Sequence, residues 1–398
     1  MSLLRIALPA LAVVGSAYAA SCSNSATSTI QNGGDATAIA ACTTYSGSIA
    51  VATGLSDDIA FDGNLKKIDG DLVLESNSNI KRFGSATLQS ISGKLTLNDV
   101  SQLAALSFPA LTSVDELTLK GLPNLRALEF NLTKADKLDI ENTKLQNLDG
   151  IDLEEVSSIF IANNDDIASI EMQVTNITEF ITLSFNNAEV NVSFPKLESA
   201  NNISFRAIGS LNIPMLSKIN SGSFGVFESD NLETVSAPNL TKIDGALVID
   251  NNKGLKNISF ASLTDVGANL QIANNTNLHA IDGLPKLKNV QAALDMSGNF
   301  SKVATPSLDY VKGVFNLQST GDIGSVCTDF YEPLKSKGKL QKGKYVCEGK
   351  LEQANTAGST PKTGSGSSGS SDDKGAAVGL TVPSISLGLV GLAAVLLL

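Results

Sequence analysis

Short segments with apolar residues at alternate positions recur along most of the chain. One runs Leu247-Val-Ile-Asp-Asn-Asn252, and 23 residues later its counterpart runs Leu270-Gln-Ile-Ala-Asn-Asn275. Alternation with a period of two is typical of a β-strand that buries one face. The pattern therefore predicts a half-buried strand in each repeat.

Thirteen units, spaced by 21–24 residues, fill residues 49–320 when the chain is aligned on this element. Periods of 20–29 residues mark leucine-rich or β-helical solenoids. The units begin at Ile49, Leu72, Leu95, Leu117, Leu138, Ile159, Ile181, Ile203, Phe224, Leu247, Leu270, Leu294 and Phe315.

The rest of each unit consists of two further short apolar segments, such as residues 232–235 and 238–243. They are rich in β-branched residues and separated by Gly, Pro and Asn, so they leave no room for a long helix. We therefore expect an all-β fold, a parallel β-helix or leucine-rich-repeat-like solenoid. Coils stacked about 4.8 Å apart would form a rod roughly 60 Å long.

The sixth position of the strand element is polar in most units and is predicted to face inward. A side chain there can bond the backbone of adjacent coils and satisfy amides that the bend leaves free. Val100, Leu122 and Ile208 interrupt this column, so we expect it to form in separate pieces. Its polar members are Asn77, Thr143, Asn164, Asn186, Ser229, Asn252, Asn275, Asn299 and Thr320.

Four cysteines form one close pair near each end of the repeats. In a secreted protein such cysteines form disulfides. Of three possible connectivities we expect Cys22–Cys42 and Cys327–Cys347, because each loop is then short, and each bond would add about 3 kcal/mol. A metal site is the alternative, but a lone histidine, His279, and the lack of a Cys-x-x-Cys motif argue against it.

The first 19 residues have the features of a secretory signal peptide. Arg5 precedes an apolar run, and Ala17 and Ala19 fit a signal-peptidase site, so cleavage is expected after Ala19. The apolar run is too short to cross a bilayer.

The other end of the chain has the features of a GPI-attachment signal. Small residues, a polar spacer and a terminal apolar run follow one another after residue 350. We expect attachment at Gly369, with Ser370 and Gly375 as alternatives. A tail-anchored helix is the competing interpretation, and the N-terminal signal argues against it.

The predicted organisation places disulfide-closed caps over the strand edges at both ends of the solenoid, where free edges would invite aggregation. The segments are a signal peptide (1–19), an N-terminal cap (20–48), the solenoid (49–320), a C-terminal cap (321–349), a Ser/Gly-rich stalk (350–369) and a removed propeptide (370–398).

In this combination the chain resembles a known family. Its repeat resembles the receptor L domain, the β-helical module of insulin- and EGF-type receptor ectodomains. With the signal peptide, cysteine caps, stalk and GPI tail, residues 1–398 are similar to the fungal "extracellular mutant" and sporulation-related GPI proteins of cell-wall organisation. The resemblance implies a glycoprotein at the plasma membrane or wall, needed for wall integrity and morphogenesis, and no catalytic residue can be carried over from it.

Eight Asn-x-Ser/Thr sequons occur. The expected register places the asparagine of one of them inside the solenoid. Asn299 falls in the inward column, so we predict it to be the least glycosylated, which peptide mapping would test. Sugar is expected at the remaining sequons, Asn131, Asn176, Asn191, Asn202, Asn239, Asn257 and Asn274.

Candidates for catalysis are few. The acidic pairs Asp57-Asp58 and Asp165-Asp166 could suggest a glycan-cleaving enzyme, which needs two carboxylates at a set separation in a cleft. Acidic residues at turns are usually turn formers, however, and His279 is expected on the outside. We therefore expect no enzyme, no cofactor and no metal.

A binding role has more candidates. Phe160 and Phe227 are predicted to point outward and could stack on a sugar or a partner. The net charge of −11 argues against electrostatic binding to nucleic acid or to anionic membranes. The outward strand positions hold Glu75, Asn98, Lys120, Glu141, Ser184, Arg206, Asp250, Ser297 and Gln318.

Three functions follow from these observations. The first is a non-catalytic wall glycoprotein held by a GPI lipid on the extracellular face of the plasma membrane, in the cell wall, or in both. The second is a receptor-like or adhesive module that binds a wall polysaccharide or wall protein. The third, a glycan-active enzyme, is disfavoured. The sequence leaves open whether the lipid is later exchanged for a covalent link to wall glucan.

Overall fold

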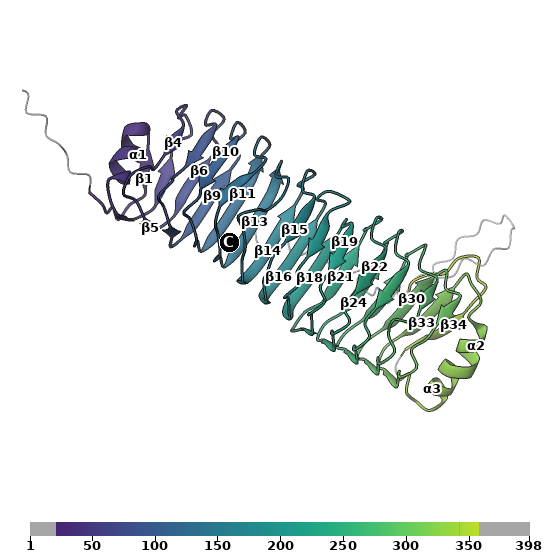
Figure 1. Ribbon diagram of the computed structural model, residues 1–398. Coiled ribbons are helices and arrows are strands. Elements are labelled where there is room, and N and C mark those ends of the chain that lie inside the picture. The colour runs from purple at the N-terminus through teal and green to yellow at the C-terminus, as the bar shows by residue number, and fades with distance from the viewer. Residues whose placement is uncertain (1–20, 342, 358–398) are drawn as a thin grey trace, which may run out of the picture.

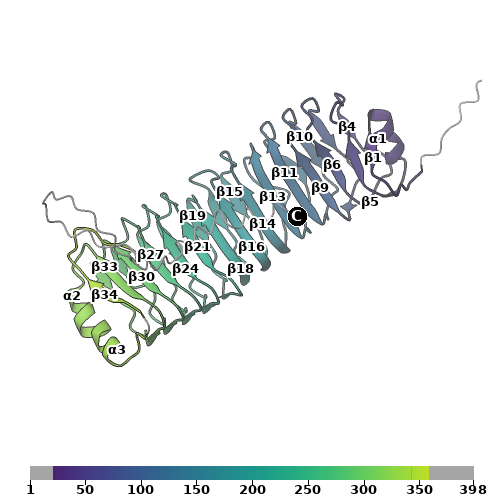
Figure 2. The same cartoon turned by 180° about the vertical axis from the view of Figure 1, so that it is seen from behind.

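The computed structural model describes residues 21–341 and 343–357, which form one elongated rod of stacked coils. Helix α1 lies at one end of the rod and helices α2 and α3 at the other (Figures 1 and 2). The predicted all-β solenoid of about thirteen coils is confirmed. The predicted signal peptide, Gly369 and the propeptide lie outside the described residues.

One long parallel sheet runs the length of the rod and contributes a strand from every coil. Because neighbouring strands are about 4.8 Å apart, this side is about 65 Å long. The strands are β1 (Ser28–Ile30), β3 (Ile49–Val51), β6 (Leu72–Glu75), β9 (Lys94–Asn98), β11 (Glu116–Leu122), β13 (Lys137–Thr143), β14 (Glu155–Ala162), β16 (Asn176–Ser184), β18 (Ser199–Arg206), β21 (Phe224–Phe227), β24 (Leu247–Asp250), β27 (Leu270–Ala273), β30 (Leu294–Gly298), β33 (Phe315–Ser319) and β34 (Tyr345–Glu348). We call this side the main face.

Two further sides complete each coil. Short strands just before the main strand form the third side: β2 (Thr44–Ser46), β5 (Lys67–Asp69), β8 (Ser90–Ile91), β20 (Lys218–Ile219), β23 (Lys242–Ile243), β26 (Asp265–Val266), β29 (Asn289–Val290) and β32 (Tyr310–Val311). The last five are continuous with the main sheet, because the long strand β18 also pairs with β20. The second side follows the main strand: β4 (Ile59–Ala60), β7 (Arg82–Gly84), β10 (Ala105–Phe108), β12 (Leu128–Phe130), β15 (Ser169–Glu171), β17 (Asn191–Ser193), β19 (Ser210–Asn212), β22 (Thr234–Ser236), β25 (Asn257–Ser259), β28 (Ala280–Ile281) and β31 (Lys302–Val303).

Inward side chains of successive coils lie over one another and form the core. Leu247, Leu270 and Leu294 are register partners, and each is at most 1% exposed. Phenylalanines of successive coils also follow one another on the second side, where the Phe61–Phe83 and Phe83–Phe108 rings meet edge to face with centroids 6.1 and 5.7 Å apart. Because each coil covers the next, no coil buries its apolar residues alone.

A left-handed residue lies just after the main strand, or just before its last residue, in ten consecutive coils. Glycine and asparagine adopt this conformation most readily, whereas a bulky side chain there is unusual. The bend turns the following residue inward. The corner residues are Ser76, Asp99, Gly121, Asn142, Asn163, Phe185, Ala207, Glu228, Asn251 and Asn274.

The inward position after this corner holds the predicted polar column, and its bonds run between coils as expected. Asn252 Oδ1 accepts from Ser229 N at 3.0 Å, while Asn252 Nδ2 donates to Val226 O at 3.1 Å. Asn275 repeats the pattern one coil later, accepting from Asn252 N at 2.9 Å. The side chains thus satisfy backbone groups that the corner removes from the strand ladder.

The column does not include Asn299 or Thr320, and the prediction for these two residues is wrong. Both are exposed, and the inward positions are taken by Phe300 and Ser319. Neither coil has a left-handed corner, so strand alternation continues to the fifth residue, Gly298 or Ser319. The Phe300 ring fills the space that a side chain at Gly298 would occupy. The structural reason for excluding Asn299 from glycosylation is thereby removed.

Each cap adds a strand to the main sheet and a helix beside it. At the N-terminal end, β1 pairs with β3 and helix α1 (Gly33–Ala40) follows, its first turn capped by Asn32 Oδ1. The Cys22–Cys42 disulfide, which has the expected connectivity, ties this helix to the preceding segment.

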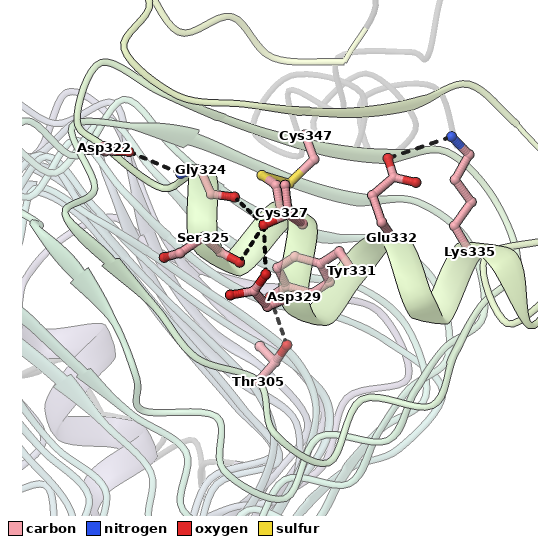
Figure 3. The surroundings of a disulfide bond; sticks show 11 residues. Thr305, Asp322, Gly324, Ser325, Cys327, Asp329, Tyr331, Glu332, Lys335 and Cys347 are labelled. Carbon is pink, nitrogen blue, oxygen red and sulfur yellow. Dashed lines mark hydrogen bonds and ion pairs between the residues drawn. A yellow bond between two sulfur atoms is a disulfide. The ribbon is translucent and has the colours of Figure 1, made fainter.

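The C-terminal cap contains α2 (Gly324–Val326), a π-helical turn, η1 (Cys327–Tyr331), and α3 (Glu332–Ser336). The second expected disulfide, Cys327–Cys347, joins η1 to β34 (Figure 3). Tyr331 is 1% exposed, donates or accepts a 2.9 Å hydrogen bond with Thr305 Oγ1, and packs 4.8 Å from the Phe315 ring. None of the helices within 21–341 and 343–357 has the length and apolar character to cross a membrane.

Two asparagines with different surroundings test the register. Replacing Asn252 with alanine should lower the free energy of unfolding by about 2–3 kcal/mol, because Ser229 N and Val226 O then lose buried partners. Replacing Asn299 with alanine should cost less than about 0.5 kcal/mol, since its side chain is exposed. Guanidinium unfolding measures both values, and equal losses would contradict the register described here.

Candidate functional site

The main face carries the predicted row of outward side chains. The strand pairing places Glu75 beside Asn98, and Ser184 beside Arg206, one coil apart in each case. Ala162, Phe227 and Ala273 occupy the same row in three further coils. Residues more than 20 positions apart in sequence are therefore neighbours along the rod.

A charged cluster on two adjacent coils was missed by sequence reasoning. Lys120 Nζ lies 2.7 Å from Asp139 Oδ2 and 2.7 Å from Glu141 Oε1 in the next coil. Burial raises the pKa of Asp139 from 3.8 to about 6. The negative charge of Glu141 also raises this pKa, and the positive charge of Lys120, which lowers it, does not offset the effect of burial. Burial opposes protonation of Lys120, but hydrogen bonds with the two carboxylates leave its pKa raised.

An arginine between two phenylalanine rings forms a second cluster. The Arg206 guanidinium carbon is 5.7 Å from the Phe185 ring centroid and 5.1 Å from that of Phe227. Arg206 Nη1 also pairs with Glu228 Oε1 at 2.5 Å. Phe227 points outward as predicted but is only 7% exposed, because its ring lies over Gly225.

Phe185 is the accessible member of this cluster and was not anticipated. Its side chain is 51% exposed although its backbone is left-handed, with φ 51°. Most of the other corners hold small or polar residues, and a bulky residue in this conformation is strained. The sequence signal was available, since Phe185 precedes the inward Asn186 just as Asn251 precedes Asn252.

The C-terminal end of the main face is covered by the chain itself. Residues 350–357, which we call the strap, return over β33 and β30. Asn316 Nδ2 donates to Asn355 O at 3.0 Å, Asn355 N donates to Gln318 Oε1 at 3.1 Å, and Ala357 N donates to Asp295 Oδ2 at 3.0 Å. Gln318 is buried under the strap, and its register partner Ser297 is buried as well, so the predicted polar row is not accessible there.

The acidic pairs take part in structural contacts between coils. Asp58 Oδ1 accepts hydrogen bonds from two backbone groups of the next coil, Lys81 N at 3.1 Å and Arg82 N at 2.9 Å. These bonds tie the turn that contains Asp58 to the neighbouring coil. Asp57 and Asp58 line an open polar hollow rather than an enclosed cleft.

The second acidic pair has a basic partner that its sequence neighbours did not reveal. Lys144, from the preceding coil, lies 3.8 Å from Asp165 Oδ2 and 3.5 Å from Asp166 Oδ1. His279 is exposed as predicted, with Nδ1 3.0 Å from Asn299 O. Across residues 21–341 and 343–357, no group of three or more His, Cys, Asp and Glu could hold a metal ion.

The sequons lie around the rod but avoid the centre of the main face. Asn191 and Asn257 point outward from the second side, as the register predicted. Asn202 and Asn274 lie at the two borders of the main face. Asn131, Asn239 and Asn299 are also exposed, and Asn176 is half-buried. Glycosylation at these sequons stays a prediction.

A family model described as "Ecm33: GPI-anchored cell wall organization protein" matches residues 1–40. Curated relatives match over nearly the full length. "Protein ecm33" from Aspergillus fumigatus is 37% identical over 94% of this chain and 91% of its own length. A "Cell surface GPI-anchored protein" from Arthroderma benhamiae is 35% identical over 95% of this chain and 94% of its own.

More distant relatives cover less of their own length. "Sporulation-specific protein 2" from Saccharomyces cerevisiae is 28% identical over 80% of this chain and 63% of its own length. No solved structure matches the chain.

The raised pKa of Asp139 predicts a pH-dependent contribution to stability. The folded state binds the proton more tightly than the unfolded state, so stability due to this group is full below about pH 4 and is lost as the pH rises through 6. Replacing Asp139 with asparagine should therefore stabilise the rod by about 1–2 kcal/mol at pH 7 and change little at pH 4.

Urea unfolding across this pH range measures the effect, with the exposed Asp152→Asn variant as the control. An Asp139→Asn variant whose unfolding free energy follows the wild-type pH profile would refute this assignment.

Proposed function

Because this chain belongs to the Ecm33 family of GPI-anchored cell wall organization proteins, we propose that it contributes to wall integrity and morphogenesis as a non-catalytic, lipid-tethered glycoprotein. The observation that carries the proposal is similarity along almost the whole chain, from the N-terminal segment through the solenoid. Like its relatives, the protein is located on the outer face of the plasma membrane and in the cell wall.

The described residues support a structural rather than a catalytic role. The inside of the rod is filled with packed aliphatic and aromatic side chains. Of the two acidic pairs, Asp58 holds backbone groups of the next coil and Asp165 and Asp166 face Lys144. Acid–base cleavage of a glycan needs two carboxylates facing each other across a cleft.

A rod on a tether can organise a wall because the sides of the rod are held at a set distance from the membrane. Strands that bond from cap to cap resist bending because every coil shares backbone hydrogen bonds with the next. Because the strap, residues 350–357, lies on the rod, we propose that only the part of the predicted stalk after it, residues 358–369, links the rod to the GPI lipid at Gly369. If the rod were transferred from the lipid to wall glucan, its sides would still be exposed to other wall components.

A second function, recognition of a wall polysaccharide or wall protein, is favoured by one observation. Phe185 is exposed in a strained conformation beside Arg206, and this combination offers an aromatic face next to charged hydrogen-bonding groups. Strain of this kind concentrates at functional positions. We propose this part of the main face as the contact surface.

A complementation experiment distinguishes a role in wall organisation from a catalytic role. In cells that lack this protein, a full chain with all four acidic residues, Asp57, Asp58, Asp165 and Asp166, changed to asparagine should restore resistance to wall stress as well as wild type does. Asparagine at position 58 still offers an oxygen to Lys81 N and Arg82 N, so the coil contacts survive. A chain that ends at residue 369, before the lipid signal is complete, should be secreted without restoring resistance.

Failure of the asparagine variant to restore resistance, with normal amounts at the surface, would contradict a non-catalytic role. Release of the full chain by phosphatidylinositol-specific phospholipase, followed by fractionation of membrane and glucan-bound wall, tests the tether. Retention in the membrane after phospholipase treatment would exclude the GPI lipid.

Recognition is tested with wall polysaccharides and wall proteins presented on an array. Phe185→Ala should reduce binding at least about tenfold if the ring is a central contact, because burial of an aromatic side chain contributes strongly to affinity. Lys242→Ala, an exposed change on the third side, serves as the control. Equal binding by wild type and Phe185→Ala would remove this surface from consideration.

A further inference from the structure

Phe180 is a large apolar residue left open to solvent at the border of the main face. Its side chain is 37% exposed. Phe180 immediately precedes Ile181, the first inward residue of the main-face part of β16. On one side its register partner is Ser158 in β14, and on the other it is Asn202 in β18. An exposed phenylalanine therefore lies one strand spacing, about 4.8 Å, from the acceptor asparagine of a sequon.

The Asn202 side chain is held in a defined orientation. Ser223 N, from the following coil, donates a 3.0 Å hydrogen bond to Asn202 Oδ1. A backbone N–H can only donate, so the amide oxygen faces Ser223 and Nδ2 is the amide atom that this contact leaves free for a sugar. The glycine at position 222 permits this contact, because a Cβ there would lie 2.2 Å from Asn202 Oδ1.

We propose that Asn202 is an N-glycosylation site whose first N-acetylglucosamine packs on the ring of Phe180. The donor is a lipid pyrophosphate-linked oligosaccharide. A bond forms between Asn202 Nδ2 and C1 of the sugar, the bond from C1 to the pyrophosphate oxygen breaks, the lipid pyrophosphate leaves, and Nδ2 loses one proton. Nδ2 keeps its second N–H, and Oδ1 keeps its bond to Ser223 N.

The chemistry of both partners fits this contact. One face of the pyranose ring presents C–H groups, which are apolar, and an aromatic ring offers a flat surface that such groups can cover. Contact removes apolar surface of both groups from water. Because Phe180 and Asn202 are register partners on adjacent strands, a sugar on Asn202 Nδ2 begins about one strand spacing from the residue that carries the ring.

The competing explanation is that the Phe180 ring only covers Ser158, which is 5% exposed. In that case loss of the Phe180 ring lowers the stability of the protein by the same amount whether or not Asn202 carries sugar. A double-mutant cycle distinguishes the two, because only a direct contact makes the two changes non-additive. Ser204→Ala is the matched way to remove the sugar, since it breaks the sequon and leaves the Asn202 amide in place.

The experiment uses the full chain secreted from a glycosylating fungal host, with glycans trimmed to the first N-acetylglucosamine. Phe180→Leu should lower the melting temperature by roughly 2 °C more in the glycosylated protein than in the Ser204→Ala background. Phe185→Leu, an exposed phenylalanine on the neighbouring corner that no sequon adjoins directly, should have the same effect in both backgrounds.

Nuclear magnetic resonance of the labelled sugar supplies a readout that does not depend on stability. Ring-current shifts should move the C–H protons of the Asn202 sugar upfield, and Phe180→Leu should abolish the shift while Phe185→Leu keeps it. Unshifted sugar protons, or equal melting-temperature losses in the two backgrounds, would overturn the proposal.

The inference rests on passage through the secretory route that the proposed function requires, and peptide mapping separates the two. An Asn202 without sugar in a chain whose Asn191 and Asn257 are occupied would overturn this inference and leave the proposed function intact. A chain without sugar at any sequon would count against both.

Discussion

The structure depends on coils that stack in register, so that each inward side chain lies over the same position of the next coil. Parallel backbone hydrogen bonds hold the coils at a fixed spacing, and the aliphatic columns close the interior. A shift by one residue in any coil would exchange its inward and outward side chains. The left-handed corner after the main strand is the device that sets this register in ten of the coils.

The corner creates a problem that the buried polar column solves. Bending the chain removes backbone groups from the strand ladder, and buried groups without partners are costly. Asn252 and Asn275 supply donors and acceptors at this point in successive coils. Where the corner is missing, as in β30, a phenylalanine ring fills the interior instead, and the asparagine that follows Gly298 is released to the surface.

In-register stacking also decides what the outside of the rod can do. Side chains from separate repeats meet at strand spacing, which brings Lys120 to Asp139 and Glu141 and places Arg206 between two aromatic rings. The sequons leave the centre of the main face open, while the strap closes its C-terminal end. A long face whose centre holds no sequon suits a member of a family of cell wall organization proteins.

The sequence by itself determined the repeat length, the inward aliphatic positions, the disulfide-closed ends and most of the polar column, because these follow from a regular period along one chain. It missed the left-handed corner, and for that reason it misplaced Asn299 and Thr320. Only the tertiary structure decided that Asp139 is half-buried beside Lys120, that the strap covers Gln318, and that Phe180 borders Asn202. These contacts join residues of different coils or of the returning chain, and their side-chain directions depend on the local bend, which a periodic pattern does not record.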